Sequence, residues 1–274
     1  MGLRIGTNVA AISAQRQLGK SQAQTEHAMK ALSSGSRIVS AGDDAAGFAI
    51  SEILRAQASS LKQAKNNSEN AKGLIQVAEG GLNEQNNILI RLRELALQSA
   101  SDTVGDDERD YLNTEFTGLT SEIDRIAKTT TFGSKKLLQG GSQEYEFHVG
   151  SGNKSEDIIS YTMGADTTGS SLGTSGLTIS DRSDAKSNLE DIDSAMTKIA
   201  KARASFGAIQ SRLEIAGNNL DTQYENVTDA RGKITDADIA YETSELARGQ
   251  VLKDFGVSVL AQANQDPQRV LKLL

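Results

Sequence analysis

The sequence contains no cysteine, and this absence excludes disulfide frameworks, thiolate metal sites and thiol catalysis. It also has no tryptophan and a single proline, and aromatic residues make up only 4% of the chain. Aromatic side chains supply much of the buried area of a thick globular core, so thin contacts between helices fit this composition better. Proline is the residue least compatible with a helix interior, and its scarcity favours long helices.

Charge and hydropathy exclude two further classes of protein. The formal net charge of −7 argues against a nucleic-acid partner, because phosphates require a basic surface. No segment approaches the roughly 20 apolar residues of a membrane-spanning helix. Met1–Asn8 lead into polar sequence without the apolar stretch of a secretory signal. If the protein is secreted, we therefore expect export without a cleaved signal peptide.

Two long helices are predicted in the first half of the chain, because apolar or small residues recur there at alternating steps of three and four. The first helix ends at Ser33-Ser34-Gly35-Ser36, since glycine and serine favour helix ends. Asp43 or Asp44 can cap the second helix, which we expect over Ala45–Ala100. The two patterns comprise Ala11, Ala14, Leu18, Ser21, Thr25, Ala28 and Leu32, and then Leu61, Ala64, Ser68, Ala71, Ile75, Ala78, Leu82, Gln85, Leu89, Leu92, Ala96 and Ser99.

The middle of the chain changes in character after a third, shorter helix that carries Leu112 to Ile126. Residues 143–149 alternate polar and apolar side chains, and residues 158–163 form a second strand-like run. Turn residues lie between these runs, so the sequence predicts a β-hairpin within about residues 130–178. The Thr/Gly/Ser-rich stretch Gly164–Gly176 is predicted to be an exposed loop.

Helical spacing returns near Ser183 and predicts two more helices. Thr235 and Asp238 resemble a capping box for the last helix, and Pro267 is expected to end or kink it. The two patterns comprise Leu189, Ile192, Met196, Ile199, Arg203, Phe206, Gln210, Leu213, Gly217, Leu220, Tyr224 and Val227, and then Ala237, Ala240, Ser244, Ala247, Val251, Asp254, Ser258 and Ala261.

The terminal helices have weaker apolar patterns than the central ones. Alone, neither terminal segment could bury enough surface to offset the entropy of ordering it, which favours folding against neighbouring subunits. We predict a terminal coiled-coil segment, residues 1–42 with 230–274, and an inner helical bundle, residues 43–229. The predicted terminal contacts include Leu18, Leu32, Val251, Phe255 and Leu260, and the predicted inner contacts include Leu82, Leu89, Leu92, Phe206 and Leu213.

No catalytic or cofactor-binding arrangement emerges from the sequence. Ala14–Ser21 fits a relaxed phosphate-loop pattern, but it lies inside a predicted helix with no strand before it. The two histidines, His27 and His148, lie in different kinds of predicted structure, and no further metal ligands are spaced around either one. Acidic pairs such as Asp43-Asp44 occur at helix starts, where capping explains them. We therefore predict no enzyme, no metal and no cofactor.

Specific motifs then show that the chain resembles bacterial flagellin over nearly its full length. Their order and spacing are as informative as their composition, and they extend through both predicted helical halves. The motifs are Leu32–Ile38 (LSSGSRI), Asp43–Gly47 (DDAAG), Arg91–Ala100 (RLRELALQSA), Glu122–Ile126 (EIDRI), Phe132–Leu138 (FGSKKLL) and Ser258–Gln265 (SVLAQANQ), followed by Pro267-Gln268 and Val270-Leu271.

The resemblance implies a mainly α fold: a long-helix coiled-coil bundle with a small β-hairpin region and termini that pair as a coiled coil. It implies a structural subunit that polymerises into the flagellar filament outside the cell, in a minimal form without the outer variable domains. Export through the flagellar type III apparatus is implied, as are an export chaperone and the cap and hook-associated proteins as partners. A hook–filament junction protein is the alternative, since it shares the terminal motifs.

The resemblance also implies a site for a vertebrate immune receptor, the Toll-like receptor that binds flagellin. The residues that match the family's receptor motif are Arg91, Leu95 and Glu115. Arg91 and Leu95 are four positions apart, so they lie on the same side of a helix. An alternative interpretation is structural, with Arg91 and Glu115 bridging neighbouring helices and Leu95 in the core.

Overall fold

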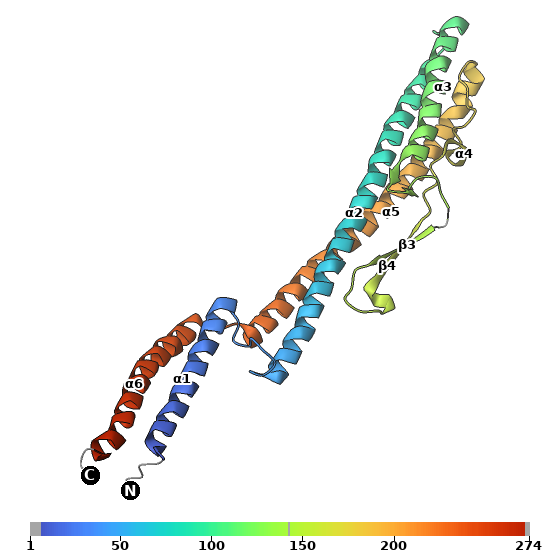
Figure 1. Ribbon diagram of the computed structural model, residues 1–274. Helices are drawn as coiled ribbons and strands as arrows, with labels where there is room; N and C mark the ends of the chain where they lie inside the picture. The colour runs from blue at the N-terminus through green and yellow to red at the C-terminus, as the bar shows by residue number, and fades with distance from the viewer. Residues whose placement is uncertain (1–6, 142, 272–274) are drawn as a thin grey trace. The chain divides into compact units, whose positions relative to one another are not determined.

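The computed structural model describes residues 7–141 and 143–271, and it consists mainly of long helices (Figure 1). In chain order these are α1 (Val9–Ser34), α2 (Ala45–Ser99), α3 (Asp106–Thr129), the short α4 (Gly169–Leu172), α5 (Arg182–Thr235) and α6 (Ile239–Leu271). A 3-10 turn, η1, covers Ser155–Asp157. The mainly α fold predicted from the sequence is confirmed.

Two small antiparallel strand pairs follow α3. β1 (Thr131–Phe132) pairs with β2 (Lys135–Lys136), and β3 (Gln143–His148) pairs with β4 (Ile158–Met163). In the second pair Tyr145 lies opposite Tyr161. The predicted hairpin is therefore present.

The chain forms two compact units. The terminal unit comprises Met1–Ala58 with Glu225–Leu274, and the inner unit comprises Ser59–Tyr224. The division falls inside α2 and α5 and not at the predicted boundaries, residues 42/43 and 229/230. In the terminal unit α1 lies beside α6, and in the inner unit α2 lies beside α5 with α3 along the second half of α2 (Figure 1).

The inner unit contains the larger core, and the predicted seam of α2 accounts for it. All twelve predicted α2 positions from Leu61 to Ser99 are buried. Buried α5 residues at seven-residue spacing face them, and α3 adds Phe116 and Ile123, both fully buried. Burial of large apolar side chains contributes about 1.5–3 kcal/mol each, so this core supplies most of the stability of the inner unit.

Local signals set the end of α1 and the start of α2. Gly35 adopts a left-handed φ of 70° after α1, which a residue with a Cβ adopts only at a cost. Asp44 Oδ1 accepts from Gly47 N (2.9 Å) at the start of α2, and Asp43 instead holds the preceding loop through Val39 N and Ser40 N. These loop hydrogen bonds, chiefly from Ser40, lower the pKa of Asp43.

The predicted cap of the last helix and its predicted end at Pro267 are both wrong. Thr235 is the last residue of α5, and the residue that caps α6 is Asp238, whose Oδ1 accepts from Ala240 N and Tyr241 N. The helix continues through Pro267 to Leu271. Tertiary partners and the other hydrogen bonds of a long helix can offset the one bond that proline removes.

The prediction of an exposed loop over Gly164–Gly176 is also wrong. This segment contains α4, and Thr167, Leu172 and Thr174 are buried. Gln85 Nε2 donates to the carbonyls of Ile123 and Thr167, so one buried amide joins α2, α3 and this segment. Polar and glycine-rich composition indicated solvent exposure, but side chains from the helices bind the backbone of the segment instead.

Candidate assembly surfaces and receptor site

The contact between α1 and α6 is antiparallel and depends on small residues. Asn8 Nδ2 donates to the Ala263 carbonyl (2.7 Å) at one end. Farther along, Ser21 Oγ donates to the carbonyl of Gly249 (3.2 Å). Such side-chain bonds to the backbone of the neighbouring helix require the two helices to approach closely.

Two glycines of α6 make this approach possible. A Cβ at Gly249 would overlap the Thr25 hydroxyl, and one at Gly256 would lie 3.1 Å from Leu18 Cδ1. Four buried or half-buried residues of α6 recur every seven positions. They are Glu242, Gly249, Gly256 and Ala263.

Two of the predicted residues of the last helix are therefore wrong as contacts with α1 within one subunit. Val251 and Phe255 are 53% and 66% exposed and lie outside the contact with α1. Leu18, Leu32 and Leu260 are half-buried. The larger apolar residues suggested a seam two positions away from the actual one, which consists mostly of glycine and alanine.

The terminal unit also exposes many large apolar side chains. Seven of the residues named below lie on α6, and α1 and the start of α2 add five more. Exposed apolar residues in such number are typical of an interaction surface. The residues are Val9, Ile12, Met29, Ile50, Ile53, Ile239, Tyr241, Val251, Leu252, Phe255, Val257 and Val259.

Replacing Gly249 with alanine should weaken the closed α1–α6 pair. Alanine favours the free helix by about 1 kcal/mol, but its Cβ forces Thr25 or the helix to move, and overpacking of this kind costs about 1–3 kcal/mol. We expect the monomer concentration needed for filament growth to rise about tenfold, the equivalent of about 1.4 kcal/mol.

Two further variants make the test of Gly249 specific. Gly207→Ala is the matched control, because nothing lies within 4 Å of a Cβ at that α5 position. Adding Thr25→Ala to Gly249→Ala should restore growth by removing the hydroxyl. If Gly249→Ala polymerises as readily as Gly207→Ala, close approach of α1 and α6 is unimportant.

The predicted inner contacts are all buried. Leu82, Leu89, Leu92 and Phe206 are 0% exposed, and Leu213 is 1% exposed. Arg109, also largely buried, caps the end of α2 by donating to the carbonyls of Ser99 and Ser101 while pairing with Asp106. The sequence analysis did not identify this capping role, although Arg109 lies one heptad before the buried Phe116.

The three predicted receptor residues do not share one surface. Arg91 Nη2 and Nε lie 2.8 and 2.9 Å from Glu115 Oε1, and Arg91 Nη1 lies 3.2 Å from Glu94. The hydrogen bonds to Glu115 and then Glu94 raise the pKa of Arg91. Leu95 is 0% exposed, so its predicted role as a surface contact is wrong. Arg91 and Glu115 remain accessible, at 49% and 44%.

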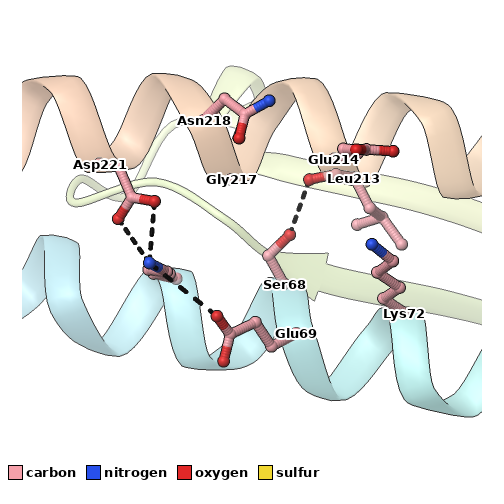
Figure 2. Close-up of a pocket in the computed structure, with 9 residues that line it drawn as sticks. Ser68, Glu69, Lys72, Leu213, Glu214, Gly217, Asn218 and Asp221 are labelled. Carbon is pink, nitrogen blue, oxygen red and sulfur yellow. Dashed lines mark hydrogen bonds and ion pairs between the residues drawn. The ribbon is translucent and has the colours of Figure 1, made fainter.

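A shallow groove of about 200 Å³ lies between α2 and α5 within the inner unit (Figure 2). Charged side chains line it, including the pair Lys65 and Asp221. Within the groove, Ser68 Oγ donates a hydrogen bond to the Leu213 carbonyl of α5, next to Gly217. Within residues 7–141 and 143–271, no group of three or more acidic or histidine side chains is placed to hold a metal ion. No helix in that part of the chain is long and apolar enough to cross a membrane.

Comparison with protein families now places the chain. Residues 5–143 match the bacterial flagellin N-terminal helical region, and residues 189–274 match the bacterial flagellin C-terminal helical region. The chain belongs to the bacterial flagellin family. Flagellin from Halalkalibacterium halodurans is 42% identical over 270 residues, which cover 98% of this chain and 99% of the relative. Flagellin from Bacillus subtilis is 36% identical over 99% of this chain and 100% of the relative.

Other relatives concern the filament and the fold. The flagellar filament 33 kDa core protein of Treponema phagedenis is 38% identical over 98% of this chain and 99% of its own. The crystal structure of Bacillus cereus flagellin matches 61% of this chain and 94% of its own with a TM-score of 0.51 and 30% identity. A flagellar hook-associated protein from Vibrio parahaemolyticus, at 16% identity and a TM-score of 0.61 over 71% of this chain and all of its own, shares the fold. Flagellins are structural proteins, and these names favour a filament subunit over the hook-junction alternative.

Proposed function

We propose that this chain polymerises with copies of itself into the filament of a bacterial flagellum, outside the cell, and acts in motility as a structural subunit. The carrying observation is the exposed apolar surface of the terminal unit, which includes Val251 and Phe255 on α6. Leaving such side chains in water is unfavourable, and neighbouring copies would bury them. The predicted terminal contacts that lie outside the α1–α6 pair thus belong to contacts between subunits.

The decisive experiment is elongation of filament seeds by purified monomer, followed by electron microscopy. Growth of filaments from short seeds supports the proposal. Monomer that stays unpolymerised at concentrations where a related flagellin elongates the same seeds would contradict it. A monomer that adds a single layer at a hook end, without further growth, would instead favour the junction alternative.

Family membership supports a proposal about export and partners. We propose export through the flagellar type III apparatus without removal of a signal peptide, with help from an export chaperone, and contact with the cap and hook-associated proteins. The thin α1–α6 contact supports passage through a narrow channel, because little burial must be given up to open the terminal unit. No enzymatic activity and no cofactor form part of this proposal.

The termini are expected to open in dilute monomer. Fixing a residue costs about 1–2 kcal/mol of backbone entropy, while the buried α1 side chains that offset it are only Ser21, Ala28 and Ala31. Amide hydrogen exchange should find α1 and α6 unprotected and the α2 and α5 segments of the inner unit protected. Equal protection in α6 and in residues 59–99 of α2 would show that the terminal unit is stable alone.

Receptor binding is proposed for the exposed pair Arg91 and Glu115. An arginine that offers forked, charge-assisted hydrogen bonds is a frequent centre of binding energy. Arg91→Ala should weaken binding of the monomer to the receptor ectodomain by about tenfold or more. The matched control is Arg93→Ala, since Arg93 is similarly exposed but pairs with Asp193 on α5. A loss below about 0.5 kcal/mol for Arg91→Ala, with folding intact, would contradict this role.

A further inference from the structure

The apolar seam between α2 and α5 repeats every seven residues along both helices. Ile192, Ile199, Phe206, Leu213 and Leu220 of α5 are all buried, and so are the α2 positions at the same spacing. A seam with this repeat offers similar contacts when one helix slides past the other by one heptad. Apolar burial by itself therefore leaves the register of the two helices weakly specified.

Ion pairs join the same two helices at regular intervals. Lys65 Nζ lies 2.7 Å from Asp221 Oδ1, and Arg93 Nε lies 2.8 Å from Asp193 Oδ1. Between them, Arg203 Nη2 lies 3.9 Å from Glu79 Oε1. The three α2 residues Lys65, Glu79 and Arg93 are two heptads apart, so they occupy one side of the helix.

The sign of the charge alternates along this row. On α2 it runs positive, negative, positive at Lys65, Glu79 and Arg93, and on α5 it runs in the opposite sense. A fourth pair, Asp102 with Arg182 at 2.5 Å, continues the alternation just beyond the end of α2. Exposed ion pairs add little stability individually, but their pattern discriminates between alternative pairings.

We propose that the three alternating ion pairs between α2 and α5, together with the hydrogen bond from Ser68 to the Leu213 carbonyl beside Gly217, fix the register of the two helices against one-heptad sliding. Each element is polar or small and contributes little to the core. Their role is to penalise the slipped arrangements that the apolar seam tolerates.

Sliding by one heptad removes most of these pairs in either direction. In one direction Arg93 would face Lys186 and Glu79 would face Met196, and only Lys65 would find a carboxylate, that of Glu214. In the other direction the same three α2 residues would face Ala200, Gln210 and Thr228, none of which carries a charge. The native register is the one in which all three pairs form.

The contact at Ser68 acts in the same sense (Figure 2). Ser68 Oγ donates to the Leu213 carbonyl at 3.0 Å. A Cβ at Gly217 would lie 3.9 Å from Ser68 Oγ. Gly217 lies beside this hydroxyl, where a single Cβ would make only an ordinary contact, so only a larger side chain would crowd the place. A one-heptad shift would bring Gln210 or Tyr224 to this place, and either side chain would hold the helices apart.

The register can be measured directly, because the chain has no cysteine and accepts a pair of spin labels at chosen sites. Labels at Asn87 and Glu214 of the full chain are about 20 Å apart along the helix axis in the native register, and a one-heptad slip changes this by about 10 Å. Both positions are exposed. Pulsed electron paramagnetic resonance measures this distance between the two labels in the monomer.

Two charge variants decide the proposal. Reversing the α5 charges alone (Asp193→Lys, Arg203→Glu, Asp221→Lys) should move at least half of the molecules to a shifted or broadened distance. Reversing the α2 charges as well (Lys65→Glu, Glu79→Lys, Arg93→Glu) restores every pair and should return the native distance. A native distance in the α5 variant would overturn the proposal. So would failure of the sixfold variant to recover the native distance, including failure caused by misfolding.

Discussion

Deleting residues 235–274 is expected to abolish filament growth while the inner unit stays folded. The deletion removes α6, so α1 loses the neighbour that buries Ser21, Ala28 and Ala31. It also removes Val251, Phe255 and the other exposed apolar residues of α6. The core of the inner unit lies within residues 59–224 and loses none of its side chains. Seed elongation and the circular dichroism melting curve measure the two effects.

A matched control separates loss of assembly from general damage. Deleting residues 150–153, the exposed turn between β3 and β4, shortens the chain without touching α1 or α6. It should leave growth measurable. If the chain that lacks residues 235–274 still elongates seeds, the terminal unit is not the essential contact. If its melting transition disappears, the inner unit depends on α6 and the division into two units is misleading.

The sequence predicted the α2 seam completely because its chemistry leaves one interpretation. Large residues such as Leu82 and Leu89 stand at the seam, and charged residues such as Glu84 stand away from it. Even the polar members, Ser68, Gln85 and Ser99, are buried, and each donates a hydrogen bond to a backbone carbonyl. A polar residue at a seam position is therefore the sequence signal that predicts a hydrogen bond from one helix to the backbone of another segment.

The α6 seam could not be predicted in the same way, because α6 buries small residues and leaves its large apolar residues exposed. Hydrophobicity ranked Val251 and Phe255 above Gly249 and Gly256 as contacts. Close packing of two helices depends on how near their backbones can come, and glycine allows the nearest approach. In a subunit that assembles, large apolar residues can be kept for neighbouring copies. A single sequence does not distinguish these two uses.

The prediction of an exposed loop over Gly164–Gly176 failed for a different reason. Its composition is that of a loop, and its order comes from residues far away in the sequence. Lys198 Nζ donates to the carbonyls of Ser171 and Leu172 from α5. Asp124 Oδ1, on α3, accepts a hydrogen bond from Gly169 N at 3.4 Å. Non-local hydrogen bonds of this kind leave no periodic trace in the segment that they hold.

Replacing Phe206 or Leu213 with alanine should destabilise the inner unit by about 2–5 kcal/mol each, because both side chains are essentially fully buried and alanine leaves a cavity. Phe206 also packs against Tyr161 of β4, with ring centroids 5.8 Å apart. Its removal should therefore loosen the hairpin as well as the helix pair. Urea unfolding followed by circular dichroism gives the free energy of unfolding, and the slope should stay near that of the unchanged chain.

The matched control lies two residues along the same helix. Ile215 is 66% exposed, so Ile215→Ala removes a large apolar side chain from α5 without opening the core. Exposed positions of this kind usually change stability by no more than about 0.5 kcal/mol. A loss at Leu213 as small as that at Ile215 would place Leu213 outside the core. A large loss at Ile215 would show that this surface is already covered in the monomer, and the two results together locate the buried side of α5.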